Sequence, residues 1–205
     1  GRSATATAIG TDPATDLAAL QIQLPGLTPI TLANSDDAQV GDVVLAIGNP
    51  YGFGHSVSQG IISGLSRYGL QASDYEDYIQ TDASVLLGSS GGALIDASGK
   101  LLGINTLIYT ANGEGADNTA IGINLATPVN VAHFVMQDLV NYGTVVRGWL
   151  GVSVELLLSP ETMAQQKQVL LVSALTEDGP AARAGLQLGD VISAINGNTV
   201  NDGRI

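Results

Sequence analysis

The feature that most constrains this chain is a glycine-rich run, Gly88–Gly92, followed at once by two short apolar segments. Residues 93–96 read Ala-Leu-Ile-Asp, residues 101–104 read Leu-Leu-Gly-Ile, and the turn between them contains Gly99. Two short apolar segments joined by a glycine-containing turn predict a β-hairpin. The serines of the run are therefore expected at the mouth of a β-barrel.

Ser90, held between glycines, suits an acyl-transfer nucleophile, because neighbouring amides without Cβ atoms can turn toward one point. The pattern Gly88-x-Ser90-x-Gly92 also matches the nucleophile elbow of α/β-hydrolases, which requires strand, turn and helix in succession. The predicted hairpin excludes that elbow. A Gly/Ser-rich surface turn without chemistry explains the loop equally well, so the loop alone leaves both interpretations open.

Short strand-like runs, separated by glycine, proline and asparagine, fill residues 1–128. They are Ala4–Ile9, Leu17–Ile22, Gly41–Ile47, Ser56–Ser63, Tyr78–Thr81, the 93–109 hairpin and Ala120–Ala126. This spacing is typical of an all-β sandwich or barrel. Two further stretches, Ser66–Asp77 and Thr110–Thr119, have the composition of mobile loops.

One helix is predicted where these runs end. Thr127-Pro128 offers an N-cap followed by proline at the first helical position, and Gly143 offers a stop. The apolar residues between them fall on one helical face, and His133 falls on the other. We therefore interpret His133 as a solvated helix residue.

A second module begins after residue 146. Trp149–Leu156 and Val169–Leu175 are predicted strands, short helices are predicted to start at Ser159 and Gly179, and Asn196-Gly197 predicts a hairpin turn. About 57 residues make a marginal independent core. The expected domains are residues 1–146 and residues 147–205.

Composition excludes several classes of function. Nineteen acidic against seven basic residues give a net charge of −12, which repels nucleic acid and anionic membranes. The chain has no cysteine, so disulfides and a thiol nucleophile are excluded. No apolar run approaches the ~18 residues of a membrane span. The first residues contain neither an initiator Met nor a signal peptide and begin in mid-strand, so we expect a piece of a longer protein.

Eight motifs, spread over nearly the whole chain, carry a resemblance. They are Thr15–Leu20 (TDLAAL), Gly41–Pro50 (GDVVLAIGNP), Gln59–Ser63 (QGIIS), Thr81–Ser84 (TDAS), Ser90–Leu94 (SGGAL), Gly103–Thr106 (GINT), Gly179–Ala182 (GPAA) and Gly189–Ile192 (GDVI). Together they resemble the HtrA (Deg) family of serine endopeptidases, and within it the DegS-like branch with a single PDZ domain. The resemblance implies an all-β fold: a chymotrypsin-like double β-barrel with an incomplete N-terminal barrel over residues 1–146, then a C-terminally truncated PDZ domain over residues 147–205.

The resemblance also assigns roles to residues around the motifs. It makes Ser90 the nucleophile, Asp16 the acid that orients a histidine, and Gly88, Ser89 and Ser90 the oxyanion hole. These roles agree with the chemistry, since a carboxylate fixes the imidazole tautomer and amides stabilise the oxyanion. Without the resemblance, Asp16 would be interpreted as a turn or cap residue.

Three residues beside the nucleophile depart from the family pattern. Leu86 and Leu87 stand where the family usually has asparagine and then proline or histidine, and Ser89 stands where it usually has asparagine. Replacing polar loop residues by two leucines is expected to change how the oxyanion loop closes.

The general base has no candidate among the 205 residues. The family order places a histidine tens of residues before the acid, but none of the residues ahead of Asp16 is a histidine. His55 and His133 match no catalytic position. We expect the base on strands upstream and the fragment itself to be inactive. Two hypotheses remain: a serine endopeptidase, or a non-catalytic PDZ-bearing peptide-binding protein on a protease fold.

Substrate contacts also follow from the resemblance. Ser84 is expected at the base of the S1 pocket, which then lacks a carboxylate for a substrate Lys or Arg. Thr106, Leu107 and Ile108 are expected to run antiparallel to the substrate and to bind its main chain. The implied preference is for small or medium apolar residues at P1.

Regulation is expected to involve the second module. Trp149, Leu150, Gly151 and Val152 resemble the carboxylate-binding loop of a PDZ domain, which binds the C-terminal peptides of partners. Arg67 aligns with the arginine that relays PDZ occupancy, although by itself it would be a solvated loop charge.

The resemblance further implies the setting in which the protein works. We expect an allosteric homotrimer in the periplasm, anchored to the inner membrane through an upstream segment. It would cleave misfolded or regulatory proteins in the envelope stress response. No cofactor and no metal are implied.

Overall fold

The structure is a computed structural model that describes residues 2–108, 123–158 and 168–200 of the 205-residue chain. The chain divides into two compact units, Gly1–Val146 and Arg147–Ile205. The loop predicted at Thr110–Thr119 and the helix predicted to start at Ser159 lie outside the described residues.

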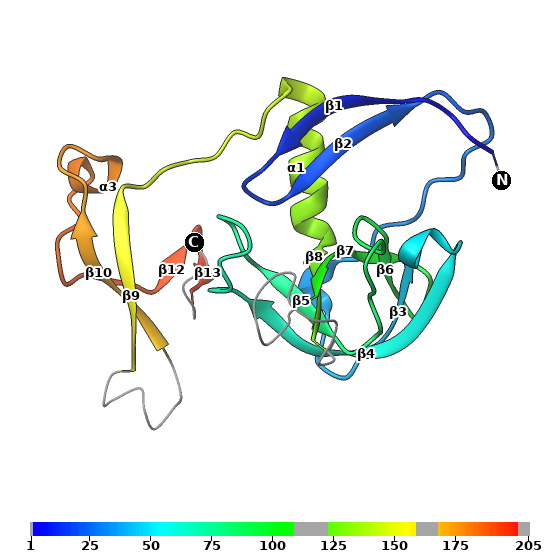
Figure 1. Ribbon diagram of the computed structural model, residues 1–205. Coiled ribbons are helices and arrows are strands. Elements are labelled where there is room, and N and C mark those ends of the chain that lie inside the picture. The colour runs from blue at the N-terminus through cyan, green and yellow to red at the C-terminus, as the bar shows by residue number, and fades with distance from the viewer. Residues whose placement is uncertain (1, 109–122, 159–167, 201–205) are drawn as a thin grey trace. The chain divides into compact units, whose positions relative to one another are not determined.

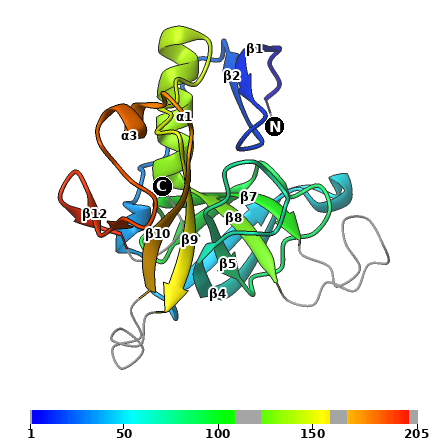
Figure 2. The same ribbon diagram turned by 90° about the vertical axis from the view of Figure 1, so that its left-hand side faces the viewer.

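A closed barrel of six antiparallel strands forms the centre of the first unit. In barrel order the strands are β3 (Val43–Gly48), β4 (Ser56–Arg67), β5 (Tyr78–Thr81), β8 (Asn124–Pro128), β7 (Leu101–Ile108) and β6 (Ala93–Asp96). β6 pairs with β3 and closes the barrel. Figure 2 shows β4, β5, β7 and β8 along one side of it. The predicted all-β barrel, including the 93–109 hairpin as β6 and β7, is confirmed.

Alternating side chains of these strands form the barrel core. In β3, Val44 is buried and Val43 is exposed, as a strand with one inward face requires. The buried cluster consists of Val44, Ala46, Ile62, Ile79, Ala83, Val85, Leu94, Leu102 and Ala126. Ala83 and Val85 lie between β5 and β6, so the segment that leads to Gly88–Gly92 is anchored in this core.

Two strands ahead of the barrel pair only with each other. β1 (Ala6–Asp12) and β2 (Leu17–Ile22) are antiparallel, and their register sets Asp12 opposite Leu17. The turn between the strands therefore contains Asp16. Helix α1 (Val129–Tyr142) contacts β1 and β2 as well as β7 and β8, and Figure 1 shows this hairpin beside the helix. The helix thus connects the β1–β2 pair to the barrel.

The ends of α1 confirm one prediction and correct another. Gly143, with φ 75°, ends the helix, and its N–H donates to the Leu139 carbonyl. The predicted N-cap at Thr127 was wrong by one residue: Pro128 holds that position, and no side chain caps the helix. The reason is that Thr127 and Pro128 belong to β8, where Pro128 pairs with Gly103, so the strand runs directly into the helix.

The second unit contains a three-stranded antiparallel sheet of β11 (Val191–Ile192), β10 (Gln168–Leu175) and β9 (Val152–Leu158). A short helix, α3 (Pro180–Arg183), follows β10. Strands β12 (Ala194–Ile195) and β13 (Asn198–Thr199) form a hairpin. Its turn residues Asn196 and Gly197 have φ 50° and 82°, as the predicted Asn-Gly turn requires. In neither unit does a described helix have the length and apolar content needed to cross a bilayer.

Candidate active site

The segment between β5 and β6 presents Ser90 on a loop pressed against the barrel. Gly88 and Gly91, with φ 94° and 82°, turn the chain on either side of the two serines. A Cβ on Gly92 would clash with the carbonyl oxygen of Ile47 in β3, so only glycine permits this approach. The Ser90 Oγ donates to the carbonyl oxygen of Thr106, 2.8 Å away. The loop thus holds Ser90 beside the middle of β7.

Backbone amides around Ser90 differ in what they bind. The N–H of Ser89 donates to the Leu86 carbonyl at 2.9 Å, and the N–H of Gly91 donates to the Asn105 carbonyl at 2.8 Å. By contrast, the N–H groups of Gly88 and Ser90 have no acceptor within the described ranges. Of the three amides expected in the oxyanion hole, those of Gly88 and Ser90 are available to a developing oxyanion, and that of Ser89 is occupied.

The residues that depart from the family pattern hold this loop through their main chains. Leu86 accepts the Ser89 N–H, and Leu87 accepts the N–H of Tyr51 at 2.9 Å. The side chain of Leu87 remains 69% exposed. Both leucines are therefore compatible with a closed loop, because the hydrogen bonds they make do not depend on their side chains.

Asp16 lies in the β1–β2 turn with a φ of 56°. Within that turn Thr15 Oγ1 donates to Asp12 Oδ2 at 2.5 Å, and both residues are buried. The Asp16 N–H donates to the Pro13 carbonyl at 3.2 Å. A non-glycine residue with positive φ is uncommon and persists where surrounding contacts hold it. The turn therefore fixes the Asp16 backbone in one conformation.

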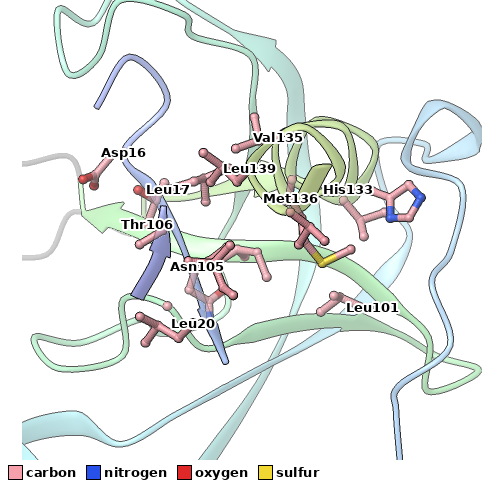
Figure 3. Close-up of a pocket in the computed structure, with 18 of the residues that line it drawn as sticks. Asp16, Leu17, Leu20, Leu101, Asn105, Thr106, His133, Val135, Met136 and Leu139 are labelled. Atoms are coloured by element: carbon pink, nitrogen blue, oxygen red, sulfur yellow. The ribbon is translucent and has the colours of Figure 1, made fainter. Parts of the chain in front are cut away.

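A cavity of about 880 Å³ joins the β1–β2 pair, α1 and the barrel. Asp16 and Ser90, which are far apart in the sequence, both line it. Figure 3 shows Asp16 together with Thr106 in its wall. Much of the remaining wall is apolar and comes from Ile9, Leu17, Leu20, Leu101, Met136, Leu139 and Val140. The structure thus brings the two residues with assigned triad roles to one cavity.

Neither histidine lies beside Asp16. Figure 3 shows Asp16 at one end of the cavity and His133 at the other, with Leu139 and Met136 between them. The prediction that His133 is solvated is only partly right: the side chain is half-buried, it lines the cavity, and its Nδ1 is buried without a partner among the described residues. The cause is that α1 is covered by the β1–β2 pair as well as by the barrel. His55 is exposed just before β4.

A second cavity, of about 170 Å³, lies beside the Gly88–Gly92 loop. The side chains around it are apolar or carry hydroxyl and amide groups: Ala46, Ile47, Pro50, Ser56, Val57, Ser58, Ser84, Leu86, Ser89 and Asn105. Ser58 Oγ donates to the Ser84 carbonyl at 2.6 Å, which ties Ser84 to β4. No carboxylate lines this cavity in the described part of the chain.

Asn105 is a site residue that sequence reasoning did not single out. It lines both cavities, is almost fully buried, and its Nδ2 donates to the Ile47 carbonyl at 3.2 Å and the Ala93 carbonyl at 3.3 Å. Asn105 therefore links β7 to β3 and β6 directly behind Ser90. The sequence signal that could have identified Asn105 is its position as a polar residue directly after the apolar run Leu101–Ile104, within the Gly-Ile-Asn-Thr motif.

Arg67 ends β4 and remains exposed. Its Nε donates to Gln80 Oε1 on β5 at 2.7 Å. The loop that follows, expected to be mobile, has a defined set of hydrogen bonds centred on Glu76.

In the second unit, the loop before β9 contains Trp149–Val152. Gly151 has φ 77°, its carbonyl accepts the N–H of Thr176 at 2.9 Å, and the Leu150 carbonyl accepts the N–H of Ala181 at 3.0 Å. The N–H groups of Leu150 and Gly151 have no acceptor in the residues the structure covers. Such amides can hold a peptide carboxylate while a neighbouring strand pairs with the peptide.

No group of three or more His, Asp or Glu side chains that could hold a metal ion occurs in the described segments. The groups at the site with roles assigned by the sequence motifs are the Ser90 hydroxyl, the Asp16 carboxylate and the backbone amides of the Gly88–Gly92 loop.

Comparisons with known proteins agree with this architecture. Residues 1–104 match the trypsin-like peptidase domain family, and residues 171–205 match the PDZ domain family. The periplasmic serine endoprotease DegP of Escherichia coli K12 is 42% identical over 205 residues, covering 98% of this chain and 42% of DegP. The serine endoprotease DegS of Haemophilus influenzae is 42% identical over 192 residues, covering 93% of this chain and 54% of DegS.

A solved structure, the HtrA-type protease AlgW with tripeptide, superposes with a TM-score of 0.80. It is 47% identical, and the match covers all of this chain and 67% of AlgW. The chain spans less than half the length of DegP but follows these proteases across both domains. It therefore belongs to the HtrA family of serine proteases, with a trypsin-like peptidase domain followed by a PDZ domain.

Proposed function

We propose that the full-length protein is a periplasmic serine endopeptidase in which Ser90 is the nucleophile and Asp16 is the triad acid. The observation that carries the proposal is that Asp16 and Ser90, from separate sheets, line one cavity. Relatives named periplasmic serine endoproteases support both the reaction and the compartment. Its proposed substrates are misfolded or regulatory proteins of the envelope stress response.

The proposed mechanism assigns one role each to a histidine, the Asp16 carboxylate and two backbone amides. A histidine removes the Ser90 Oγ proton, Asp16 holds that imidazole in the correct tautomer, and the N–H groups of Gly88 and Ser90 stabilise the oxyanion. Neither His55 nor His133 lies beside Asp16, so we place the base in a part of the protein outside residues 1–205.

The alternative is a peptide-binding protein without catalysis on a protease fold, which the match to the PDZ domain family supports. Labelling of the full-length protein by a serine-reactive fluorophosphonate separates the two. Modification confined to Ser90 supports the endopeptidase. An unmodified Ser90 alongside intact peptide binding supports the alternative.

The proposed specificity follows from the cavity of about 170 Å³ that Ser89, the neighbour of Ser90, helps to line. We propose that it is the S1 pocket, with Ser84 at its base and Thr106, Leu107 and Ile108 binding the substrate main chain. Because no carboxylate lines it among the described residues, we expect kcat/KM for Ala or Val at P1 to exceed that for Lys or Arg by about 10-fold or more. Cleavage of a P1-varied peptide library measures this ratio, and a profile dominated by Lys or Arg would overturn the assignment.

Regulation is proposed to run from the PDZ domain through Arg67 to the nucleophile loop. A bound C-terminal peptide would shift a pre-existing inactive–active equilibrium, with Trp149–Val152 as the carboxylate site. In the full-length protein, a peptide with a free apolar C-terminus is expected to raise cleavage of an unrelated substrate by about 5- to 150-fold. Amidation of that peptide should remove the effect.

Arg67→Ala should abolish this stimulation and leave peptide affinity unchanged. The matched control is Lys100→Ala, which removes an exposed cation from the β6–β7 turn and should be stimulated like the wild type. Unstimulated cleavage at peptide concentrations where binding is measured would contradict the regulation.

Assembly as a homotrimer is part of the proposal. Tyr51 and Phe53 form an exposed aromatic pair, with ring centroids 6.1 Å apart and Phe53 88% exposed. Exposed apolar groups of this kind support burial against another subunit.

A further inference from the structure

One carboxylate shapes the loop between β4 and β5. Glu76 Oε2 accepts the N–H of Leu70 at 2.6 Å, and Glu76 Oε1 accepts the N–H groups of Ala72 at 2.6 Å and Ser73 at 3.3 Å. Hydrogen bonds to an ionised acceptor are roughly twice as strong as neutral ones. The loop is therefore folded around the half-buried Glu76 side chain.

The same loop contacts the turn that carries Asp16. The N–H of Tyr75, the residue before Glu76, donates to the carbonyl oxygen of Ala14 at 2.9 Å. Ala14 lies within the β1–β2 turn, two residues before Asp16. This hydrogen bond joins the loop directly to the backbone that leads into Asp16.

Tyr78 is buried near the Glu76 loop and the turn that contains Asp16. Its hydroxyl is 2.8 Å from Ser73 Oγ, a residue whose N–H is held by Glu76. Burial raises the pKa of Tyr78, the Ser73 hydroxyl opposes that shift, and the charges of Glu76 and Asp16 add to it. The Ser73 contact attaches Tyr78 to the Glu76 loop, and the hydrogen bond from Tyr75 to Ala14 joins that loop to the Asp16 turn.

We propose that Glu76 is a positioning residue for Asp16. Its carboxylate holds the 70–76 loop in the conformation from which the Tyr75 N–H fixes the Ala14 carbonyl, and so sets where the Asp16 side chain meets the cavity. This inference rests on the proposed function. A displacement of about 1 Å in a catalytic group can cost on the order of 100-fold in rate, so a loop that holds the acid matters to catalysis.

The test uses the full-length protein and a peptide substrate. Glu76→Ala is expected to lower kcat by about 10- to 100-fold with little change in KM. Glu76→Gln keeps the size of the side chain and one acceptor oxygen, but it places an NH₂ group against one of the backbone N–H donors. The decrease in kcat should therefore be smaller than in Glu76→Ala. The matched control is Asp74→Ala, which removes an exposed carboxylate from the same loop and should retain wild-type kcat.

Two further readouts separate positioning from mere stabilisation of the loop. Hydrogen exchange of the Tyr75 amide should accelerate in Glu76→Ala, because its bond to Ala14 is released. In an Asp16→Asn background, Glu76→Ala should cause no further loss of kcat, because the residue it positions has already been disabled.

Several outcomes would overturn the inference. An unchanged kcat in Glu76→Ala would do so, as would losses from Glu76→Ala and Asp16→Asn that multiply in the double variant. Should Glu76→Ala fail to fold, Glu76→Gln decides in the same way. Full activity in Ser90→Ala would instead overturn the proposed function, and the exchange rate of the Tyr75 amide would still decide whether Glu76 docks the loop on the Asp16 turn.

Discussion

Replacing Ser90 by alanine in the full-length protein is expected to lower kcat for peptide hydrolysis on the order of 10⁶-fold, as in other serine proteases that lose their nucleophile. The loss corresponds to about 8 kcal/mol of transition-state stabilisation. Only the oxyanion-hole amides and substrate binding remain. No other hydroxyl is expected to replace Ser90 as the nucleophile. Within the described residues, Ser90 Oγ is the one hydroxyl that donates to the Thr106 carbonyl.

The measurement is single-turnover hydrolysis together with fluorophosphonate labelling. Ser98→Ala is the matched control, since it removes a hydroxyl from the exposed β6–β7 turn of the same unit. It should keep wild-type kcat. A Ser90→Ala protein that still hydrolyses peptides within 10-fold of the wild type, at an unchanged melting temperature, would show that Ser90 is only a turn residue.

The strands were the most predictable part of this fold. β2 (Leu17–Ile22) and β5 (Tyr78–Thr81) agree with the sequence prediction at both ends, because turn-forming residues flank short apolar runs. β4 is longer than predicted and continues to Arg67. The predicted strand ended at Ser63, but the observed strand continues past Gly64 through register shifts while pairing with β5. Irregular pairing of this kind depends on the neighbouring strand and leaves little local signal.

Within the candidate site, sequence reasoning identified the groups but not the contacts that hold them. The motifs pointed to Ser90 and Asp16, and the structure places both on one cavity. The carboxylate of Glu76 was missed, because its partners are backbone amides, which every residue possesses. The partial burial of His133 was missed because helical periodicity shows which face is apolar, whereas the packing of two sheets on α1 decides which residues are covered.

Replacing Asp16 by asparagine is expected to lower kcat by about 10⁴-fold, because an amide stabilises the wrong imidazole tautomer while preserving the shape of the site. The fold should survive the change. Asp16 has φ 56°, a conformation that asparagine tolerates well, and the hydrogen bonds that hold the turn come from Asp12, Thr15 and the backbone. An unchanged melting temperature with a large loss of kcat is therefore the expected signature.

Asp37→Asn provides the control for this measurement, because it removes one exposed carboxylate from the 3₁₀ turn Ser35–Asp37 without touching the cavity. It should leave kcat unchanged. The Asp16→Asn protein should also react with fluorophosphonate far more slowly than the wild type, since the histidine that activates Ser90 is no longer held in place. If Asp16→Asn instead retained kcat within about 10-fold, Asp16 would be a turn residue of the β1–β2 hairpin, and the acid of the triad would have to lie elsewhere.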